Sequence, residues 1–193
     1  NIAGDPLAPQ SSEDWEQRLT GLGFMVHHPD AGTVCTMAGL VLFGRNPRRS
    51  LRQSGVRWMS FMGETKEYQA QDDEILNGPL LALWEGRIGA GRYIVEEGLL
   101  ERLMSRMRPF ISEEENTITN GLRRERNYYY SLDAIREALL NALVHRDWTR
   151  SIEIEVVNYS NRLEITSPGA LQNSMTIEKM LAGQRSPRNP IIV

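Results

Sequence analysis

The stretch SLDAIREALLNALVHRDW, residues 131–148, is followed by IEIEVV (152–157), a turn NYSN and RLEIT (162–166). Ser131 is a good N-cap, and the run after it is apolar on most of its circumference, which predicts a helix buried on several sides. The later segments alternate strictly, which predicts a β-hairpin. Its core side would hold Ile152, Ile154, Val156, Leu163 and Ile165. Helices covering one face of a sheet predict an α+β fold.

A narrow polar stripe interrupts this apolar helix. Glu137, Asn141 and His145 are each four residues from the next, so they share one side of the helix. A stripe this thin is expected to line a cavity, and the alternative is the polar edge of an ordinary amphipathic helix. An Asn carbonyl oxygen is a ligand suited to Mg²⁺, and a Glu one turn earlier can polarise a water for attack on phosphorus. His145 or Arg146 could then contact a phosphate.

Upstream, the sequence predicts a second unit with helices and strands. SSEDWEQRLTGLGF (11–24) is expected to form a helix, followed by a hairpin around PDAG (29–32). This outline fits either the edge of a winged helix or an ordinary packing unit. MAGLVLF (37–43) has a start signal at Thr36 and a stop at Gly44, and VRWMSF (56–61) is expected to be a strand. From Gly78, LLALWE and residues 96–110 are expected to be helical.

A basic loop precedes that strand. RNPRRSLRQSGVR (45–57) contains no acidic residue, and an acidic stretch follows it from Glu64 to Glu74. Such a cluster can neutralise phosphates, and the alternative is a solvated loop. The candidate contacts to DNA are Arg45, Arg48, Arg49 and Arg52.

Composition excludes several classes of protein. The 193 residues are 40% hydrophobic and 24% charged, with a net charge of -3. No segment reads as a membrane span or signal peptide, which predicts a cytoplasmic protein without a membrane partner. One cysteine and three histidines are too few for a disulfide or a structural zinc site, and the only lysines, Lys66 and Lys179, lie outside any phosphate-loop motif. The chain starts without Met and stops within RNPIIV, so we expect it to be part of a longer protein.

Two resemblances to known families rest on these motifs. The E-x-x-x-N of REALLNALVHRDW resembles the N-box of the GHKL ATP-binding fold of gyrase, Hsp90, histidine kinases and MutL. The same run, with LEITSPGAL, TIEKMLAG and RSPRNPIIV, is similar to the C-terminal domain of RecG-related bacterial proteins described as ATP-dependent DNA helicases or transcriptional regulators. TMAGLVLFGRNPRR and GVRWMSF resemble the end of their Schlafen-type, Alba-like DNA-binding domain. The resemblance implies the C-terminal part of that domain in 1–77, a helical connector in 78–115 and a truncated GHKL-like (HATPase) domain in 116–193.

The resemblance also implies a function. It suggests a DNA-binding transcriptional regulator with an ATP-binding module, in which Glu137 is the catalytic base of a weak ATPase and Asn141 holds Mg²⁺. The remaining nucleotide contacts would be His145, Arg146, Ser167 and Gly169. Ser167 stands where the family has an Asp for adenine, and Leu171 replaces a Gly. The alternative is a non-enzymatic protein that binds DNA or forms a homo-oligomer, with the GHKL-like fold kept as a scaffold.

Overall fold

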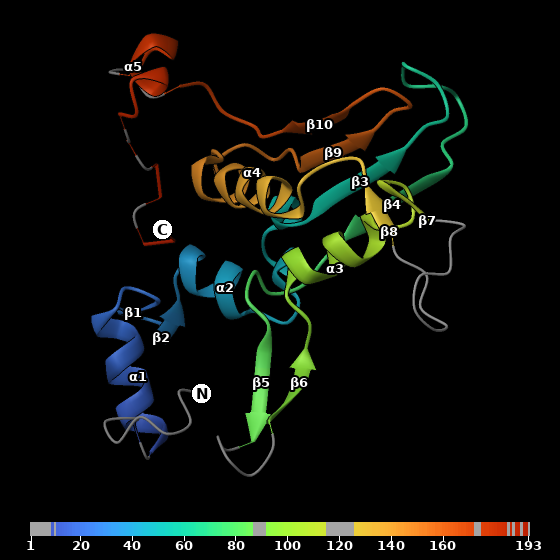
Figure 1. Ribbon diagram of the computed structural model, residues 1–193. Coiled ribbons are helices and arrows are strands. Elements are labelled where there is room, and N and C mark those ends of the chain that lie inside the picture. Colours follow the sequence, from blue (N-terminus) through green and yellow to red (C-terminus); the bar gives the residue numbers. More distant parts are fainter. Residues whose placement is uncertain are drawn as a thin grey trace.

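A four-stranded sheet forms the centre of the computed structural model, which describes residues 9, 11–86, 92–114, 126–171, 175–184, 186, 188–189 and 191–192 (Figure 1). The strand order is β10-β9-β3-β4. β3 (Val56–Ser60) pairs in parallel with β9 (Ile154–Asn158), whereas β4 (Asp72–Leu76) and β10 (Leu163–Thr166) add antiparallel edges. Residues 98 positions apart, such as Ser60 and Asn158, therefore meet in neighbouring strands.

Two helices cover one face of this sheet. α3 (Leu99–Met107) lies against β3 and β4, and α4 (Leu132–His145) lies against β10 and α3. Alternate residues of the strands point into this layer, because successive side chains of a strand face opposite sides. The most deeply buried side chains of the layer are Val56, Trp58, Leu103, Met107, Leu139, Ile154 and Val156. Trp58 also donates a hydrogen bond to Asp72 on β4 at 2.8 Å, which ties the edge strand to the core.

The remaining elements surround this centre. The N-terminal part holds α1 (Ser12–Gly21), the hairpin β1–β2 (Met25–His28 and Gly32–Cys35) and α2 (Met37–Phe43). Two short 3₁₀ turns, η1 (Pro47–Arg49) and η2 (Arg52–Ser54), lead into β3. A ribbon of β5 (Leu83–Gly86) and β6 (Arg92–Glu96) extends away from the sheet (Figure 1). β7 (Ser112–Glu114) pairs with β8 (Arg126–Tyr128), and α5 (Ile177–Leu181) follows β10.

The α+β class predicted from the sequence is confirmed, but two details were wrong. Ile152 is 57% exposed, because β9 begins only at Ile154. The expected helix at LLALWE is a strand from Leu83, paired with the β-branched and aromatic run of β6. The segment expected to be a helical connector thus contains a β-ribbon as well as α3.

The central sheet runs through the expected domain boundaries. β3 and β4 come from the segment 1–77, and β9 and β10 come from 116–193, yet all four share one ladder. The division into domains stays a prediction. Among the described helices the longest has 14 residues, and none has the length and apolarity needed to cross a membrane.

A buried arginine beside this ladder links the segment before β3 to the segment before β9. Arg146 is fully buried and donates hydrogen bonds of 2.6 Å to the carbonyl oxygens of Gln53 and Ile152. Its guanidinium lies 4.3 Å above the Trp148 ring, and Gln53 donates in return to the Trp148 carbonyl at 2.9 Å. Burial lowers the pKa of Arg146 to about 10, although the charges of Glu153 and Asp147 oppose this shift. The side chain therefore remains a cation at neutral pH.

Arg146→Ala is expected to lower the free energy of unfolding by about 3–5 kcal/mol, because it removes the donor of two part-buried hydrogen bonds and opens a cavity where a fully buried side chain stood. Arg136→Ala is the matched control. Arg136 is half-exposed and pairs with Glu101 at 3.3 Å, so its loss should cost less than about 1 kcal/mol. Urea unfolding followed by circular dichroism measures both, and equal small losses would contradict the role of Arg146.

Candidate functional site

The polar stripe of α4 faces solvent. Glu137, Asn141 and His145 are all exposed, as are Asp133 and Arg136 on the same helix. The Asn141 amide donates to Glu137 Oε1 at 3.1 Å, so the two side chains pair with each other. The structure does bring Glu137 and Asn141 together, as the spacing predicted, but on an open helix surface.

The other predicted nucleotide contacts, Arg146, Ser167 and Gly169, have structural roles in the fold. The Arg146 guanidinium points into the protein, away from the stripe's solvent side. The Ser167 hydroxyl donates to the Ala142 carbonyl of α4 at 2.8 Å, which ties the end of β10 to the helix. Gly169 has a φ of +133°, and a Cβ atom there would lie 3.1 Å from the Cβ of Asp147. This backbone conformation and close approach explain why residue 169 is a glycine.

Sequence reasoning missed a polar network next to Gly169. Asn189 donates to the carbonyls of Val144 and Arg146 at 2.5 and 3.0 Å, so it caps the C-terminal end of α4. Arg188 donates to the Ala170 carbonyl and forms an ion pair with Asp147 at 3.2 Å. Hydrogen bonds from Thr149, together with the charges of Arg188 and Arg150, hold the pKa of Asp147 below its ordinary value. The sequence signal for this network is Arg188-Asn189-Pro190, part of the RSPRNPIIV run that carries the family resemblance.

These placements do not fit a Mg-nucleotide site. Of the two candidate phosphate ligands, Arg146 is buried and His145 is exposed. The candidate adenine acceptor donates its hydroxyl proton to a carbonyl, and the Glu137–Asn141 pair lies on an exposed helix face. Within the described residues, no three His, Cys, Asp or Glu side chains lie together as a metal site. We therefore derive no step through ATP or Mg²⁺.

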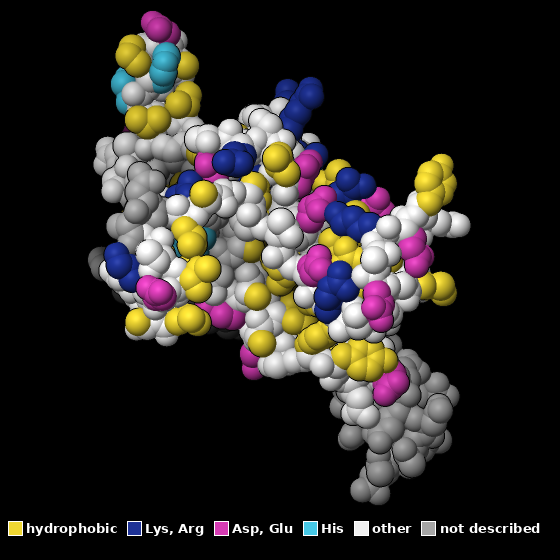
Figure 2. Space-filling model, turned by 90° about the horizontal axis from the view of Figure 1, so that it is seen from above, with side chains coloured by type: hydrophobic (Ala, Val, Ile, Leu, Met, Phe, Trp, Pro, Cys, Tyr) yellow, Lys and Arg dark blue, Asp and Glu magenta, His cyan; other side chains and the backbone are white. Residues whose placement is uncertain are grey.

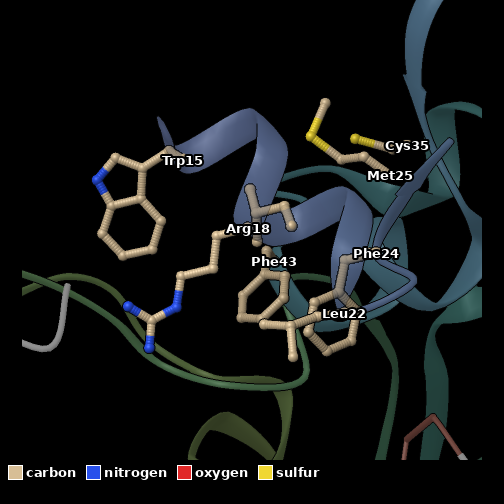
Figure 3. Close-up of a pocket in the computed structure, with 9 residues that line it drawn as sticks. Trp15, Arg18, Leu22, Phe24, Met25, Cys35 and Phe43 are labelled. Carbon is tan, nitrogen blue, oxygen red and sulfur yellow. The ribbon is translucent and has the colours of Figure 1, made fainter. Parts of the chain in front are cut away.

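Two cavities lie elsewhere. One, of about 570 Å³, is an apolar hollow between α1, the β1–β2 hairpin and α2, with Arg18 among Trp15, Leu22 and Phe43 (Figure 3). The other, of about 680 Å³, lies between β4 and α3 and is lined by Asp72, Glu74 and Arg106. Neither cavity contains a predicted site residue.

The structure divides the predicted basic stretch 45–57: Arg57 lies in β3, and the remaining basic loop, residues 45–54, contains the two short 3₁₀ turns η1 and η2. Pro47 is fully buried at the start of η1, and Leu51 packs against the core. The Leu51 N–H donates to the Pro47 carbonyl at 2.8 Å, and Asn46 accepts a hydrogen bond from Asn77 at 2.9 Å. The side chains of Arg45, Arg49 and Arg52 are exposed, and none of them has an acidic partner in the described part of the chain. Three cations thus project from an anchored backbone.

Arg48, the fourth predicted DNA contact, turns toward the sheet instead. Both of its Nη atoms donate to Oε1 of Glu153 at 3.0 Å. It passes over Gly55, where a Cβ atom would lie 2.9 Å from Arg48 Nη1. Burial raises the pKa of the Glu153 carboxyl. The opposing effects are larger: hydrogen bonds from its own backbone N–H and from Arg48, and the charges of Arg48 and Arg57, lower the pKa. The pKa lies below its ordinary value, so the pair is ionic at neutral pH.

Charges on the outer face of the sheet compensate one another. Figure 2 shows basic and acidic side chains interleaved on the surface seen from above. Arg57 forms two hydrogen bonds with Asp73, and Lys66 pairs with Glu155 at 2.9 Å. The hydrogen bond from Arg57 is the main cause that lowers the pKa of Asp73. This face therefore offers few free cations, in contrast to the basic loop.

Comparisons with known proteins agree with this fold. Residues 150–193, which contain β9, β10 and α5, match the family described as "Putative ATP-dependent DNA helicase recG C-terminal". No curated protein matches the chain. The crystal structure of the DIP2311 protein from Corynebacterium diphtheriae is similar, with a TM-score of 0.59 and 24% identity over 92% of this chain. The chain spans 31% of that protein's length, and this likeness shows a shared fold.

This match over residues 150–193 supports the predicted RecG-related resemblance. The Schlafen-type, Alba-like assignment of the N-terminal part stays a prediction.

Asn189 and Asn141 are expected to contribute differently to the stability of the fold. Asn189→Ala should lower the free energy of unfolding by about 1–3 kcal/mol, because it leaves two carbonyls at the end of α4 without their donor. Asn141→Ala should change it by less than about 0.5 kcal/mol, because Asn141 is exposed and contacts only Glu137 among the hydrogen bonds of the described chain. Parallel urea titrations test this, and a reversed order would show that Asn141 is the structural residue.

Proposed function

We propose that this chain binds the phosphate backbone of DNA through its basic loop. We also propose that its helicase-like segment, residues 150–193, is a non-catalytic scaffold. The observation that carries the proposal is that Arg45, Arg49 and Arg52 are exposed and have no acidic partner among the described residues. Guanidinium groups suit phosphate because their donors form a planar fork. Contacts of this kind bind without reading base sequence.

The loop's anchoring supports binding. Buried Pro47 and partly buried Leu51 fix the backbone, and Arg146 holds Gln53 at the end of the loop. Cations on a fixed backbone lose less conformational entropy on binding than cations on a mobile one. Cations spread along a surface also match a repeating polyanion better than a single nucleotide, which needs an enclosing pocket.

A DNA-binding regulator of the RecG-related type is the role that this combination supports. The sequence has no phosphate loop, so it lacks the machinery of a P-loop motor. The exposed Glu137–Asn141 pair and the buried Arg146 support the scaffold over the ATPase.

Replacing the three exposed arginines tests the DNA site. If each contacts one phosphate, affinity for a short random-sequence duplex should fall about 40-fold between 50 and 200 mM salt. Arg45→Gln, Arg49→Gln and Arg52→Gln together should make affinity nearly independent of salt over this range. Arg57→Gln removes the same charge from a paired site and should leave the salt dependence unchanged. An unchanged salt dependence in the triple variant would exclude the basic loop as the site.

Titration calorimetry with Mg-ATP tests the scaffold. We expect no binding heat from the wild type or from Asn141→Ala, because the candidate contacts are buried or exposed without a pocket. Heat in the wild type that disappears in Asn141→Ala would establish a metal-nucleotide site on α4 and refute this part of the proposal.

A further inference from the structure

The ion pair between Arg48 and Glu153 lies at the border of the basic loop. Arg48 belongs to η1, next to exposed Arg49, and Glu153 directly precedes β9 in the helicase-like segment. Both side chains are about one-quarter exposed, at 24% and 27%. The pair is therefore reachable from solvent, unlike the nearby Arg146.

We propose that Glu153 regulates the basic loop by occupying Arg48 as an internal substitute for a DNA phosphate. The proposal rests on the DNA-binding function proposed above. Glu153 keeps Arg48, the fourth cation of the loop, from contacting DNA. A phosphate must displace the Glu153 carboxylate before Arg48 can contribute to binding.

The geometry of the pair permits this exchange. Both Nη atoms of Arg48 share one oxygen of Glu153, rather than forming a fork with both oxygens. A two-oxygen fork is the stronger arrangement for Arg and carboxylate, so a phosphate that accepts two parallel hydrogen bonds can compete. The charge of Arg57 also stabilises the ionised carboxylate of Glu153.

The surrounding backbone keeps Glu153 in position. Arg146 joins the Gln53 and Ile152 carbonyls, one on each side of the pair, and the residue after Glu153 starts β9, paired with β3. Only the Arg48 side chain must move for the exchange, because buried Pro47 anchors the backbone before it. Regulation thus acts through a side-chain swap on a fixed frame.

Glu153→Gln tests the inference, because it removes the charge and keeps the shape. The variant should bind the random-sequence duplex more tightly than the wild type. Its affinity should fall about 150-fold between 50 and 200 mM salt, against about 40-fold for the wild type, because one more phosphate is neutralised. Arg48→Gln should remove this gain in the Glu153→Gln background, yet change the wild type less than Arg49→Gln does. Circular dichroism checks that each variant is folded.

Glu155→Gln is the matched control. It removes the same charge two residues away, from a carboxylate that pairs with Lys66 outside the basic loop. An equal gain in this control, or a gain that survives Arg48→Gln, would overturn the inference and assign the effect to general charge. A wild type whose binding depends on Arg45, Arg49 and Arg52 but does not respond to Glu153→Gln would overturn the inference alone. Absence of DNA binding by both the wild type and Glu153→Gln would overturn the proposed function as well.

Discussion

The parallel pairing of β3 with β9 is the constraint on which the rest of the structure depends. Parallel neighbours need a long crossover connection, and here everything from β4 to α4 lies within it. The crossover brings α3 and α4 onto one face of the sheet, where they close the core over Trp58 and Ile154. It also places the turns before β3 beside the loop before β9, so residues distant in sequence share one polar border.

At that border, three arginines have different roles. Arg146 follows an apolar helix and precedes Trp148, and the fold buries it against two carbonyls and that ring. Arg49 follows buried Pro47 on a short turn and remains exposed. Arg48 lies between these extremes, half-buried with a carboxylate. Residue type decides that each is a cation, but only the tertiary partners decide whether the cation supports the fold or remains available to a ligand.

Local signals in the sequence predicted the elements that local physics controls. Ser131 and Thr36 cap α4 and α2 as expected, and alternation located β9 and β10. The sequence did not show β4, because its acidic residues pair with arginines of distant elements, as Asp72 does with Arg106. Nor could the helical spacing of Glu137 and Asn141 show whether their side of α4 would be covered. Spacing defines a shared face, whereas burial of that face depends on which other elements pack there.

The same border connects residues 150–193 to the basic loop. Glu153 lies within the matched residues 150–193 and Arg146 just before them, and both reach residues between 48 and 53. When ligands bind on both sides of this contact, each changes the affinity for the other by the same factor, since coupling between binding sites is reciprocal. Residues 150–193 can therefore affect the basic loop through a contact that involves no nucleotide, because the loop before β9 keeps Glu153 beside Arg48. In this chain the parallel ladder and the buried guanidinium of Arg146 maintain that spacing.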